Sequence, residues 1–446
     1  MKRYLIASLL VPLGIGVLPT QAAPPTVQAD DPVLAWNEIV AEATVRSGIA
    51  PLFDPLHESR LYAMVHIAVH DALNGIERHS RPYAVDLGLQ PDASPAAAVA
   101  TAAHDVLVPV LRGLPPAFAA GIQPAVDYVE AQYDLALDAV SDGTAEDRGV
   151  ALGQAAAEAV VQMRANDGAD TPFFDETPIV KPEPGDFQWV AGAPFDAAPG
   201  WAEVTPFVMS DPAQFRPGPP HPLTSLIYAA DFNEVKTLGG TTSSVRTADQ
   251  TEAAFFWFEA SPMRWNRIAR TASVDAGLDM WANARLFGLL DVALADGYIG
   301  NWDSKQHYNR WRPETAIREA HKDGNPLTKR DKDWTPLWGS SGATPEYDSG
   351  HSIEGAAAAV VLAEVLGTNF MTFEICSYTF QFEPEKNCDG ASPVFRTYDS
   401  FSAAAWENSQ SRIWLGWHTR NAIEVGYRHG ERIGERAVDL YFSLVP

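Results

Sequence analysis

Basic residues and cysteines are scarce in this sequence of 446 residues. It contains 32 Lys and Arg against 57 Asp and Glu, which gives a formal net charge of -25. Binding to nucleic-acid phosphates needs the opposite balance, so nucleic acid is excluded from the expected partners. The two cysteines, Cys376 and Cys388, are too far apart for a CxxC metal or redox site. Their polar surroundings favour a disulfide that closes a surface loop in an oxidising compartment.

Long apolar runs are missing beyond the N-terminus, so no membrane span is expected in the rest of the chain. Residues 1–22 have the pattern of a secretory signal peptide. Lys2 and Arg3 precede an apolar stretch over residues 4–18, and Thr20-Gln21-Ala22 forms a small-x-small cleavage site. This stretch is shorter than the ~20 residues of a spanning helix, which argues against the alternative of a membrane anchor. We therefore expect a secreted or periplasmic protein.

Internal repeats and the short alternating runs typical of strands are also lacking. The 46% of hydrophobic residues is enough for a large core and excludes general disorder. Apolar residues recur with helical periodicity over about 33–48, 94–112, 118–140 and 145–165, and a long helix is expected over about 274–298. The sequence therefore predicts a mainly α fold.

Twelve prolines between Pro172 and Pro222 exclude a helix there and predict a long ordered wrap. We interpret this wrap as the boundary between two packed helical bundles, residues 23–222 and 223–446. After it, Thr247 and Gln250 have the spacing of a capping box that opens an aromatic helix.

Candidate chemistry is concentrated in three segments of the last third. The first contains Lys305 and Arg312, followed by Pro313. If this segment is helical, the two cations lie two turns apart on one face, and Pro313 ends the helix. Such a pair can bind one oxyanion, although a solvated basic face is an equal alternative for this segment alone.

The second segment is Ser349-Gly350-His351, which leads directly into an apolar helix. A helix N-terminus offers free backbone N–H groups and a positive dipole end, and here a hydroxyl and an imidazole are added. These features suit an anion site with an acid or base attached. The plainer alternative is an ordinary helix cap with a surface histidine.

The third segment runs from Arg412 to His418. Gly416 interrupts the helical pattern, so the two side chains can converge despite a spacing of six residues. Arginine binds tetrahedral anions with a rigid fork, and a histidine beside it suits a nucleophile or a ligand of a metal oxyanion. A buried histidine bonded to backbone is the alternative.

Taken in order, Lys-x6-Arg-Pro, Ser-Gly-His and Arg-x5-His resemble the three-part signature of type 2 phosphatidic acid phosphatases, bacterial acid phosphatases and vanadium-dependent haloperoxidases. A looser likeness to secreted bacterial haloperoxidases extends over residues 60–74, 215–218 and 243–248. The resemblance implies a pair of helical bundles with an oxyanion, vanadate, at the end of the second bundle.

The resemblance also implies a role for each residue of the signature. The ligands of the vanadate oxygens would be Lys305, Arg312, Ser349, Gly350 and Arg412. His418 would be the axial ligand of vanadium, or the nucleophile in a phosphatase, and His351 would be the acid–base group. Trp302 stands where chloroperoxidase-like members also have an aromatic residue.

Three activities follow as alternatives. In a haloperoxidase, the favoured function, hydrogen peroxide replaces oxygens of the vanadate, Lys305 polarises the peroxide, and halide is oxidised to hypohalous acid. In a secreted phosphatase, His418 would form a phosphohistidine while His351 protonates the leaving alcohol of a phosphate ester. The third alternative is a non-catalytic oxyanion-binding protein of the cell envelope.

Three positions depart from the family pattern. Asp348 replaces the usual proline before Ser349 and is expected to bring a negative charge beside the anion. Ala422 stands where an acidic residue commonly orients the axial histidine, which leaves Asn421 or Glu424 as substitutes at other spacings. Thr344 replaces the residue associated with halide preference, so no halide is predicted.

Other candidates carry less weight. His66 and His70 have the i,i+4 spacing of metal ligands, but the Glu of an HExxH motif is missing and the helix has an apolar face. We therefore expect packing or support roles for both. Residues 321–325 lack the alternating acids of a calcium loop and are expected to form a turn.

Overall fold

The computed structural model describes residues 31–190, 193–259, 261–339, 342–380, 383–440 and 442–445. The signal peptide predicted over residues 1–22 lies outside the described residues. Within these ranges the chain forms α-helices joined by loops, with two small antiparallel sheets, β1–β2 and β3–β4.

The first part of the described chain contains five helices and one small sheet. Their bounds are α1 (Pro32–Ser47), α2 (Pro55–Asn74), α3 (Pro95–Arg112), α4 (Ala119–Asp138), α5 (Thr144–Met163), β1 (Phe174–Asp175) and β2 (Asp196–Ala197). The second part contains α6 (Leu226–Leu238), α7 (Ala248–Phe256), α8 (Ser261–Ala276), α9 (Met280–Tyr308), α10 (Pro313–Arg318), α11 (Gly350–Leu366), β3 (Phe373–Cys376), β4 (Phe395–Tyr398), α12 (Phe401–Trp414) and α13 (Arg420–Leu440).

Local capping explains several of these helix starts. Asp31, Asp54 and Ser94 accept backbone N–H bonds at the starts of α1, α2 and α3, and each is followed by a proline at the first helical position. The predicted capping box of Thr247 and Gln250 opens α7. The helices expected near 33–48, 94–112, 118–140 and 145–165 are confirmed as α1, α3, α4 and α5.

The single helix expected over 274–298 is wrong at both ends. The chain leaves α8 at Gly277, which has φ +66°, and Asp279 then caps α9 by accepting the N–H of Ala282. A left-handed residue followed by a cap is a helix break. From there α9 continues to Tyr308, well beyond the expected end.

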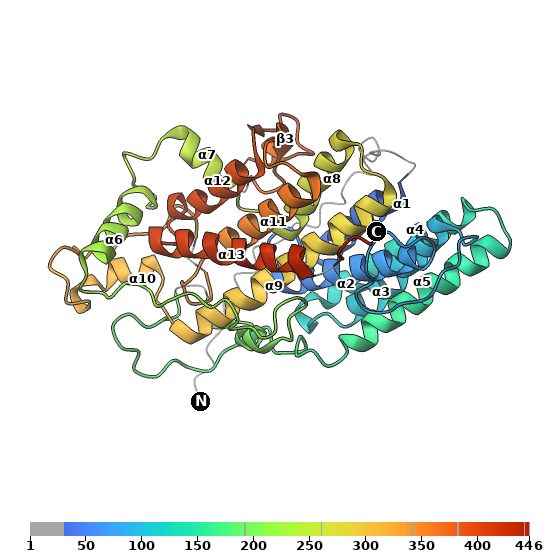
Figure 1. Ribbon diagram of the computed structural model, residues 1–446. Coiled ribbons are helices and arrows are strands. Elements are labelled where there is room, and N and C mark those ends of the chain that lie inside the picture. Colours follow the sequence, from blue (N-terminus) through green and yellow to red (C-terminus); the bar gives the residue numbers. More distant parts are fainter. Residues whose placement is uncertain are drawn as a thin grey trace.

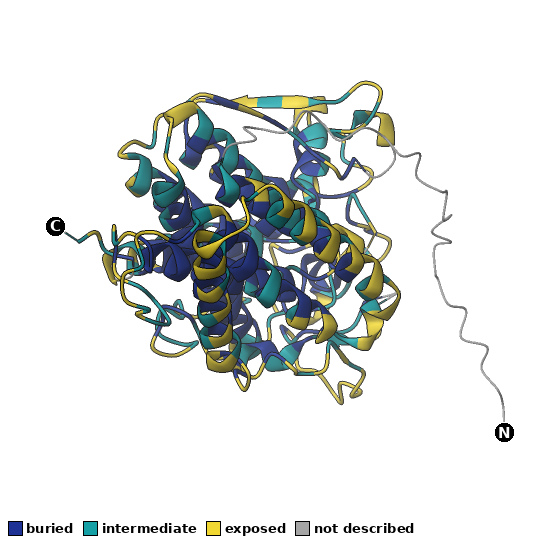
Figure 2. Cartoon of the chain, turned by 90° about the vertical axis from the view of Figure 1, so that its right-hand side faces the viewer, coloured by how far each residue is buried: buried dark blue, intermediate teal, exposed yellow. Residues whose placement is uncertain are grey.

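The helices form two packed bundles, as predicted. Figure 1 shows α3, α4 and α5 on one side, α6, α7, α10 and α12 on the other, and the long helix α9 running between them. Nearly all of α9 from Asn283 to Lys305 is buried, and one hydrophobic core passes through both bundles. Figure 2 shows these buried helices at the centre and exposed residues on the outer ones. The domain boundary at residue 222 remains a sequence-based prediction.

As expected, the proline-rich wrap contains no α-helix in its described part. In space it lies alongside α9. The backbone N–H groups of Phe207, Val208 and Met209 donate to the buried Asp296 carboxylate of α9. Nearer the end of α9, Arg216 forms a two-point ion pair with Asp303, at 2.6 Å for each bond. These contacts fix the wrap against the helix that carries Lys305.

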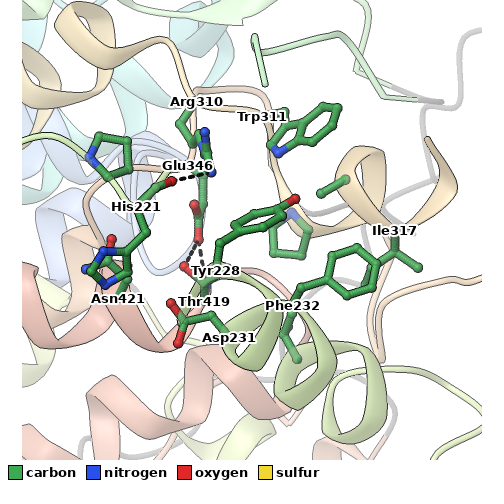
Figure 3. Close-up of a pocket in the computed structure, with 14 residues that line it drawn as sticks. His221, Tyr228, Asp231, Phe232, Arg310, Trp311, Ile317, Glu346, Thr419 and Asn421 are labelled. Atoms are coloured by element: carbon green, nitrogen blue, oxygen red, sulfur yellow. Dashed lines mark hydrogen bonds between the residues drawn. The ribbon is translucent and has the colours of Figure 1, made fainter. Parts of the chain in front are cut away.

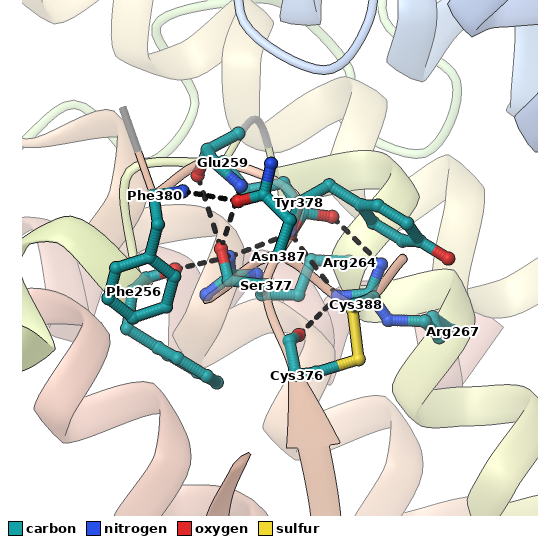
Figure 4. The surroundings of a disulfide bond; sticks show 11 residues. Phe256, Glu259, Arg264, Arg267, Cys376, Ser377, Tyr378, Phe380, Asn387 and Cys388 are labelled. Carbon is teal, nitrogen blue, oxygen red and sulfur yellow. Dashed lines mark hydrogen bonds and ion pairs between the residues drawn. A yellow bond between two sulfur atoms is a disulfide. The ribbon is translucent and has the colours of Figure 1, made fainter. Parts of the chain in front are cut away.

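The predicted disulfide between Cys376 and Cys388 is present, with a Cα–Cα distance of 5.2 Å. It joins the end of β3 to the loop before β4, and Figure 4 shows its surroundings. As to membrane spans, no single helix in the described part of the chain is long and apolar enough to qualify. One bent pair, Pro95–Arg112 with Pro116–Asp138, passes the test of length and composition together.

Candidate active site

Lys305 and Arg312 lie close to the same buried region, but on different elements. Asn309, in the left-handed conformation, ends α9 after Lys305, and Arg312 is the N-cap of α10. The expectation of one helical face ended by Pro313 is therefore wrong. Pro313 is the first residue of α10, a position where its fixed φ suits a helix start.

Both cations are held by backbone carbonyl groups. Lys305 Nζ donates to the carbonyl oxygens of Pro345 at 2.8 Å and Glu346 at 3.0 Å. Arg312 Nε donates to the carbonyl of Thr344 at 2.7 Å, and its Nη2 donates to the Thr344 hydroxyl at 2.7 Å. An ammonium has three N–H bonds and a guanidinium five, so each cation keeps donor capacity for a ligand.

The Ser349-Gly350-His351 segment lies at a helix N-terminus, as predicted. Ser349 is the N-cap of α11, and its side chain makes no capping bond to the helix. A side chain on Gly350 would meet the Asn301 amide, since a Cβ there would lie 3.1 Å from Asn301 Oδ1. This close approach explains glycine at the first helical position.

Gly416 lies in the turn that separates α12 from α13, as predicted for the third segment. It has φ +82°, and the N–H groups of Trp417 and His418 both donate to the carbonyl of Arg412, at 2.9 and 3.3 Å. This folded turn brings His418 back toward the helix that carries Arg412.

The three segments converge around His418. Arg312 Nη1 lies 3.2 Å from His418 Nε2, and because an arginine only donates, Nε2 accepts and the ring proton is on Nδ1. Burial, followed by the charges of Arg312, Lys305 and Arg412, lowers the pKa of His418 well below its usual value. The imidazole is therefore neutral at neutral pH, as a ligand or nucleophile must be.

Burial also lowers the pKa of the surrounding cations. The pKa of Arg312 falls to about 10 and that of Arg412 to about 9, while the pKa of Lys305 falls well below its usual value through burial and the charge of Arg312. Concentrated positive charge in a low-dielectric region is unfavourable unless an anion balances it.

Four predicted site residues carry buried polar atoms with no hydrogen-bond partner among the described residues. These atoms are Ser349 Oγ, His351 Nε2, Arg412 Nη1 and His418 Nδ1. Most buried polar groups in proteins are hydrogen-bonded, so these unpaired atoms indicate a missing partner. Two of them, the hydroxyl and the guanidinium nitrogen, are donors of the kind that bind oxyanions, so the residues fit vanadate or phosphate.

His351 lies at the more accessible side of this region, with 23% of its side chain exposed. Its Nδ1 is 3.8 Å from Glu354 Oε1, and the hydroxyl of Tyr298 donates to the other oxygen of Glu354. Burial and the charges of Arg412 and Arg264 lower the pKa of His351 well below its usual value. Burial raises the pKa of Glu354 to about 8.

Two of the three departures from the family pattern have structural explanations. The Asp348 carboxylate is paired away from the anion site, accepting from Asn301 Nδ2 at 2.7 Å and lying 3.0 Å from His429 Nδ1. Thr344 supports Arg312 through its carbonyl and hydroxyl groups. Ala422 is buried, and His418 Nδ1 has no partner in the described part of the chain, so neither proposed substitute orients it.

Sequence reasoning missed a stripe of glycines that brings α13 against α11. A Cβ on Gly426, Gly430 or Gly434 would lie 2.8, 2.0 or 2.9 Å from the carbonyl oxygens of Ser349, Ile353 and Ala357, respectively. Only residues without a side chain permit this approach. The signal was present in the sequence as a glycine at every fourth residue.

Glu346 was also missed, although it links the site to a neighbouring pocket. Its carboxylate accepts the N–H and the hydroxyl of Thr419, at 2.6 and 2.8 Å, and its carbonyl accepts Lys305. Figure 3 shows the pocket, which Tyr228, Asp231, Arg310 and Trp311 also line. None of the predicted site residues lines it, so it lies beside the convergent cluster.

The remaining histidine candidates are buried, as expected. His66 contacts Asn37 Nδ2 at 2.9 Å, and His70 contacts Ser80 Oγ at 2.6 Å. Burial lowers the pKa of His66 to about 3. The described ranges hold no group of three His, Cys, Asp or Glu side chains arranged for a metal ion.

The fold is a pair of helical bundles with a buried cationic cluster, and comparisons with known proteins show what it is similar to. Residues 285–445 match the model of the vanadium chloroperoxidase second helical-bundle domain. The vanadium chloroperoxidase of Curvularia inaequalis is 24% identical over 280 residues, an alignment that covers 50% of this chain and 45% of that protein. The chain thus spans less than half the length of this curated relative.

Solved structures show the same fold. A bacterial vanadium-dependent iodoperoxidase matches with a TM-score of 0.75 and 24% identity, covering 96% of this chain and 100% of that one. An apo bacterial vanadium-dependent chloroperoxidase matches with a TM-score of 0.68 and 16% identity, covering 87% and 94%. The chain is thus similar in sequence over its second bundle, and in fold over most of its length, to vanadium haloperoxidases.

Proposed function

We propose that this protein is a vanadate-dependent haloperoxidase, which oxidises a halide with hydrogen peroxide to hypohalous acid. The observation that carries the proposal is the set of buried, unpaired donors beside a neutral histidine: Ser349 Oγ, Arg412 Nη1 and His418. When bound, vanadate supplies a Lewis-acid centre that activates peroxide toward halide.

The chemistry of each site residue suggests its role in this activity. Lys305, Arg312, Ser349, Gly350 and Arg412 would hold the vanadate oxygens, and His418 would be the metal ligand. His351, whose side chain is the most accessible of the cluster, would exchange protons with the peroxide. Arg312 positions His418 by donating to its Nε2 until a ligand takes that place.

A paired assay tests the proposal on purified protein. One arm contains orthovanadate, hydrogen peroxide and iodide or bromide with a halogen-accepting dye, and the other contains an aryl phosphate ester without vanadate. Halogenation that needs vanadate and is lost in His418→Ala supports the proposal. Vanadate-inhibited ester hydrolysis identifies a phosphatase instead, and inactivity in both arms of a folded, oxyanion-binding protein identifies a binding role.

We also propose that the protein is exported, because its first 22 residues have the features of a signal peptide. Expression of the full chain in a bacterial host, followed by fractionation and N-terminal sequencing, tests this. A mature protein beginning at Ala23 outside the cytoplasm is expected, whereas an uncleaved cytoplasmic chain contradicts the proposal.

A further inference from the structure

A buried ion cluster lies outside the residues of the signature. Glu259 is bound by two arginines of α8, with Arg264 Nη2 at 2.8 Å and Arg267 Nη1 at 2.9 Å from its carboxylate oxygens. Glu259 and Arg264 are 1% and 0% exposed. One carboxylate balances only one of the two guanidinium charges, so the cluster holds an excess positive charge away from water.

The disulfide loop fixes this cluster from the opposite side (Figure 4). Ser377 Oγ accepts from Arg264 at 2.9 Å, and the carbonyl of Cys376 accepts from Arg267 at 2.7 Å. The backbone N–H of Tyr378 donates to Glu259 at 3.1 Å. The cations are therefore held in place from both α8 and the loop.

Trp257 connects Arg264 to the oxyanion cluster. The Arg264 guanidinium lies 4.7 Å from the centre of the Trp257 ring, and the Trp257 carbonyl accepts Arg412 Nη2 at 2.6 Å. The charge of Arg264 lowers the pKa of both Arg412 and His351, so it acts across this short distance. The charge of Arg267 is not among the main influences on either residue.

Arg264 also has unused donor capacity. Its Nη2 makes its protein contacts, whereas Nε and Nη1 are buried and have no hydrogen-bond partner among the described residues. Arg412 Nη1 is likewise buried and has no hydrogen-bond partner among the described residues. Two neighbouring guanidinium groups with unpaired buried donors and excess positive charge favour an anion between or beside them.

We propose that Arg264 is an additional cation of the oxyanion site, held by Glu259 and the disulfide loop, which strengthens binding of a tetrahedral oxyanion through its charge. This inference rests on the proposed function, because it assigns a further residue to the same site. It extends the positive surroundings of the anion from the three cations of the signature to a fourth on α8.

Isothermal titration of the purified protein with orthovanadate, and separately with inorganic phosphate, tests the inference without measuring turnover. Arg264→Gln is expected to weaken binding of either anion about tenfold or more, because a unit charge that acts on Arg412 and His351 is lost from a low-dielectric region. Arg264→Lys keeps the charge and is expected to stay within about threefold of the wild type.

Arg267→Gln is the matched control, since it removes the same charge from the same ion cluster. It is expected to weaken binding by less than about threefold, because the charge of Arg267 is not among the main influences on Arg412 or His351. Equal effects of the two Gln variants, or wild-type affinity in a folded Arg264→Gln protein, would overturn the inference. Circular dichroism and thermal melting without anion establish that each variant is folded.

Glu259→Gln provides a second test, in which anion affinity should change in the opposite direction. This test still decides the question if the Arg264→Gln protein does not fold. Removal of this negative charge leaves more of the Arg264 charge unbalanced, so both anions should bind about threefold tighter or more. Unchanged or weaker binding would contradict the inference. A wild-type protein that binds neither anion would reject the proposed function as well, so the two failures are distinguishable.

Discussion

At the scale of single residues, Thr344 orients the guanidinium group of Arg312. Its hydroxyl accepts Arg312 Nη2 at 2.7 Å, and the side chain is only 6% exposed. An arginine that binds an anion with a fixed geometry depends on such supporting contacts. Thr344, for which no role was predicted from the sequence, thus supports Arg312 through two hydrogen bonds.

Thr344→Val is expected to weaken vanadate and phosphate binding about threefold to tenfold, because the lost acceptor leaves a buried Arg312 N–H unpaired, at a cost of about 1 kcal/mol. Isothermal titration measures the affinity. Thr101→Val is the control: its buried hydroxyl contacts Tyr133 in the first bundle, so it should lower stability without changing anion affinity. Equal anion affinities for Thr344→Val and wild type would show that Arg312 needs no support from this hydroxyl.

Glu354 gives the site a pH dependence at the same scale. The raised pKa of about 8 keeps this carboxyl neutral at pH 7, with Arg412, Arg264, His351 and Tyr298 around it. Above that pH it becomes negative and offsets the charge of Arg412. Sulfate binding, which involves a probe of constant charge in this range, should therefore weaken as the pH rises through 8.

Glu354→Gln separates this effect from other titrating groups such as Lys305. The variant cannot ionise, so its sulfate affinity should change less between pH 7 and pH 9 than that of the wild type, measured by isothermal titration at constant ionic strength. The two proteins should agree near pH 7, where Glu354 is neutral in both. Parallel pH profiles would contradict the assignment of the titration to Glu354.

At the scale of elements, the site depends on how closely α13 approaches α11. Gly430→Ala would place a Cβ 2.0 Å from the Ile353 carbonyl, so the helices must separate. We expect a loss of about 1–3 kcal/mol in the free energy of unfolding, as for other overpacked sites, and weaker oxyanion binding because α11 carries Ser349. Chemical denaturation and titration measure the two effects.

Gly218→Ala is the control for this prediction. Gly218 has open space around its Cα and no positive φ, so an added methyl group meets nothing within 4 Å. Its stability and anion affinity should stay close to those of the wild type. If Gly430→Ala behaves in the same way, the separation of α11 and α13 does not limit the geometry of the site.

Helix positions could largely be predicted from the sequence, whereas the breaks and connections between helices could not. Apolar periodicity and capping residues are local signals, so α1, α3, α4, α5 and the start of α7 were correctly expected. The break after Gly277 and the left-handed Asn309 depend on a single residue each. The expected single helix across Lys305 and Arg312 failed for this reason.

The candidate site was partly predictable for a related reason. The signature residues are close in sequence within each segment, and the resemblance supplied their order. Thr344, Glu346 and Arg264 contact the cluster or its neighbours only through tertiary structure, so no local pattern revealed these contacts. The paired state of Asp348 with His429, 81 residues away, could not be inferred from its position beside Ser349.

At the scale of the whole molecule, the charge of the site and the net charge of the chain have opposite signs. The formal charge is -25, yet the proposed substrate is an anion and the buried cluster is cationic. At long range an anion is repelled by the surface, and attraction acts only near the site. Dissolved salt screens the long-range repulsion more than the short-range attraction, because the Debye length falls from about 30 Å at 0.01 M to about 8 Å at 0.15 M.

We therefore expect kcat/KM for iodide to rise about twofold or more when sodium acetate increases the ionic strength from about 10 to about 150 mM, as repulsion at a distance is screened. Hydrogen peroxide provides a control within the same enzyme, because it is uncharged and its kcat/KM at saturating iodide should not depend on salt. The variant Glu130→Gln provides a second comparison, because it removes one negative charge from the surface of α4. At low salt, its kcat/KM for iodide should be slightly higher than that of the wild type. A fall of kcat/KM for iodide with added salt would mean that the positive field of the cluster extends into solvent and outweighs the surface charge.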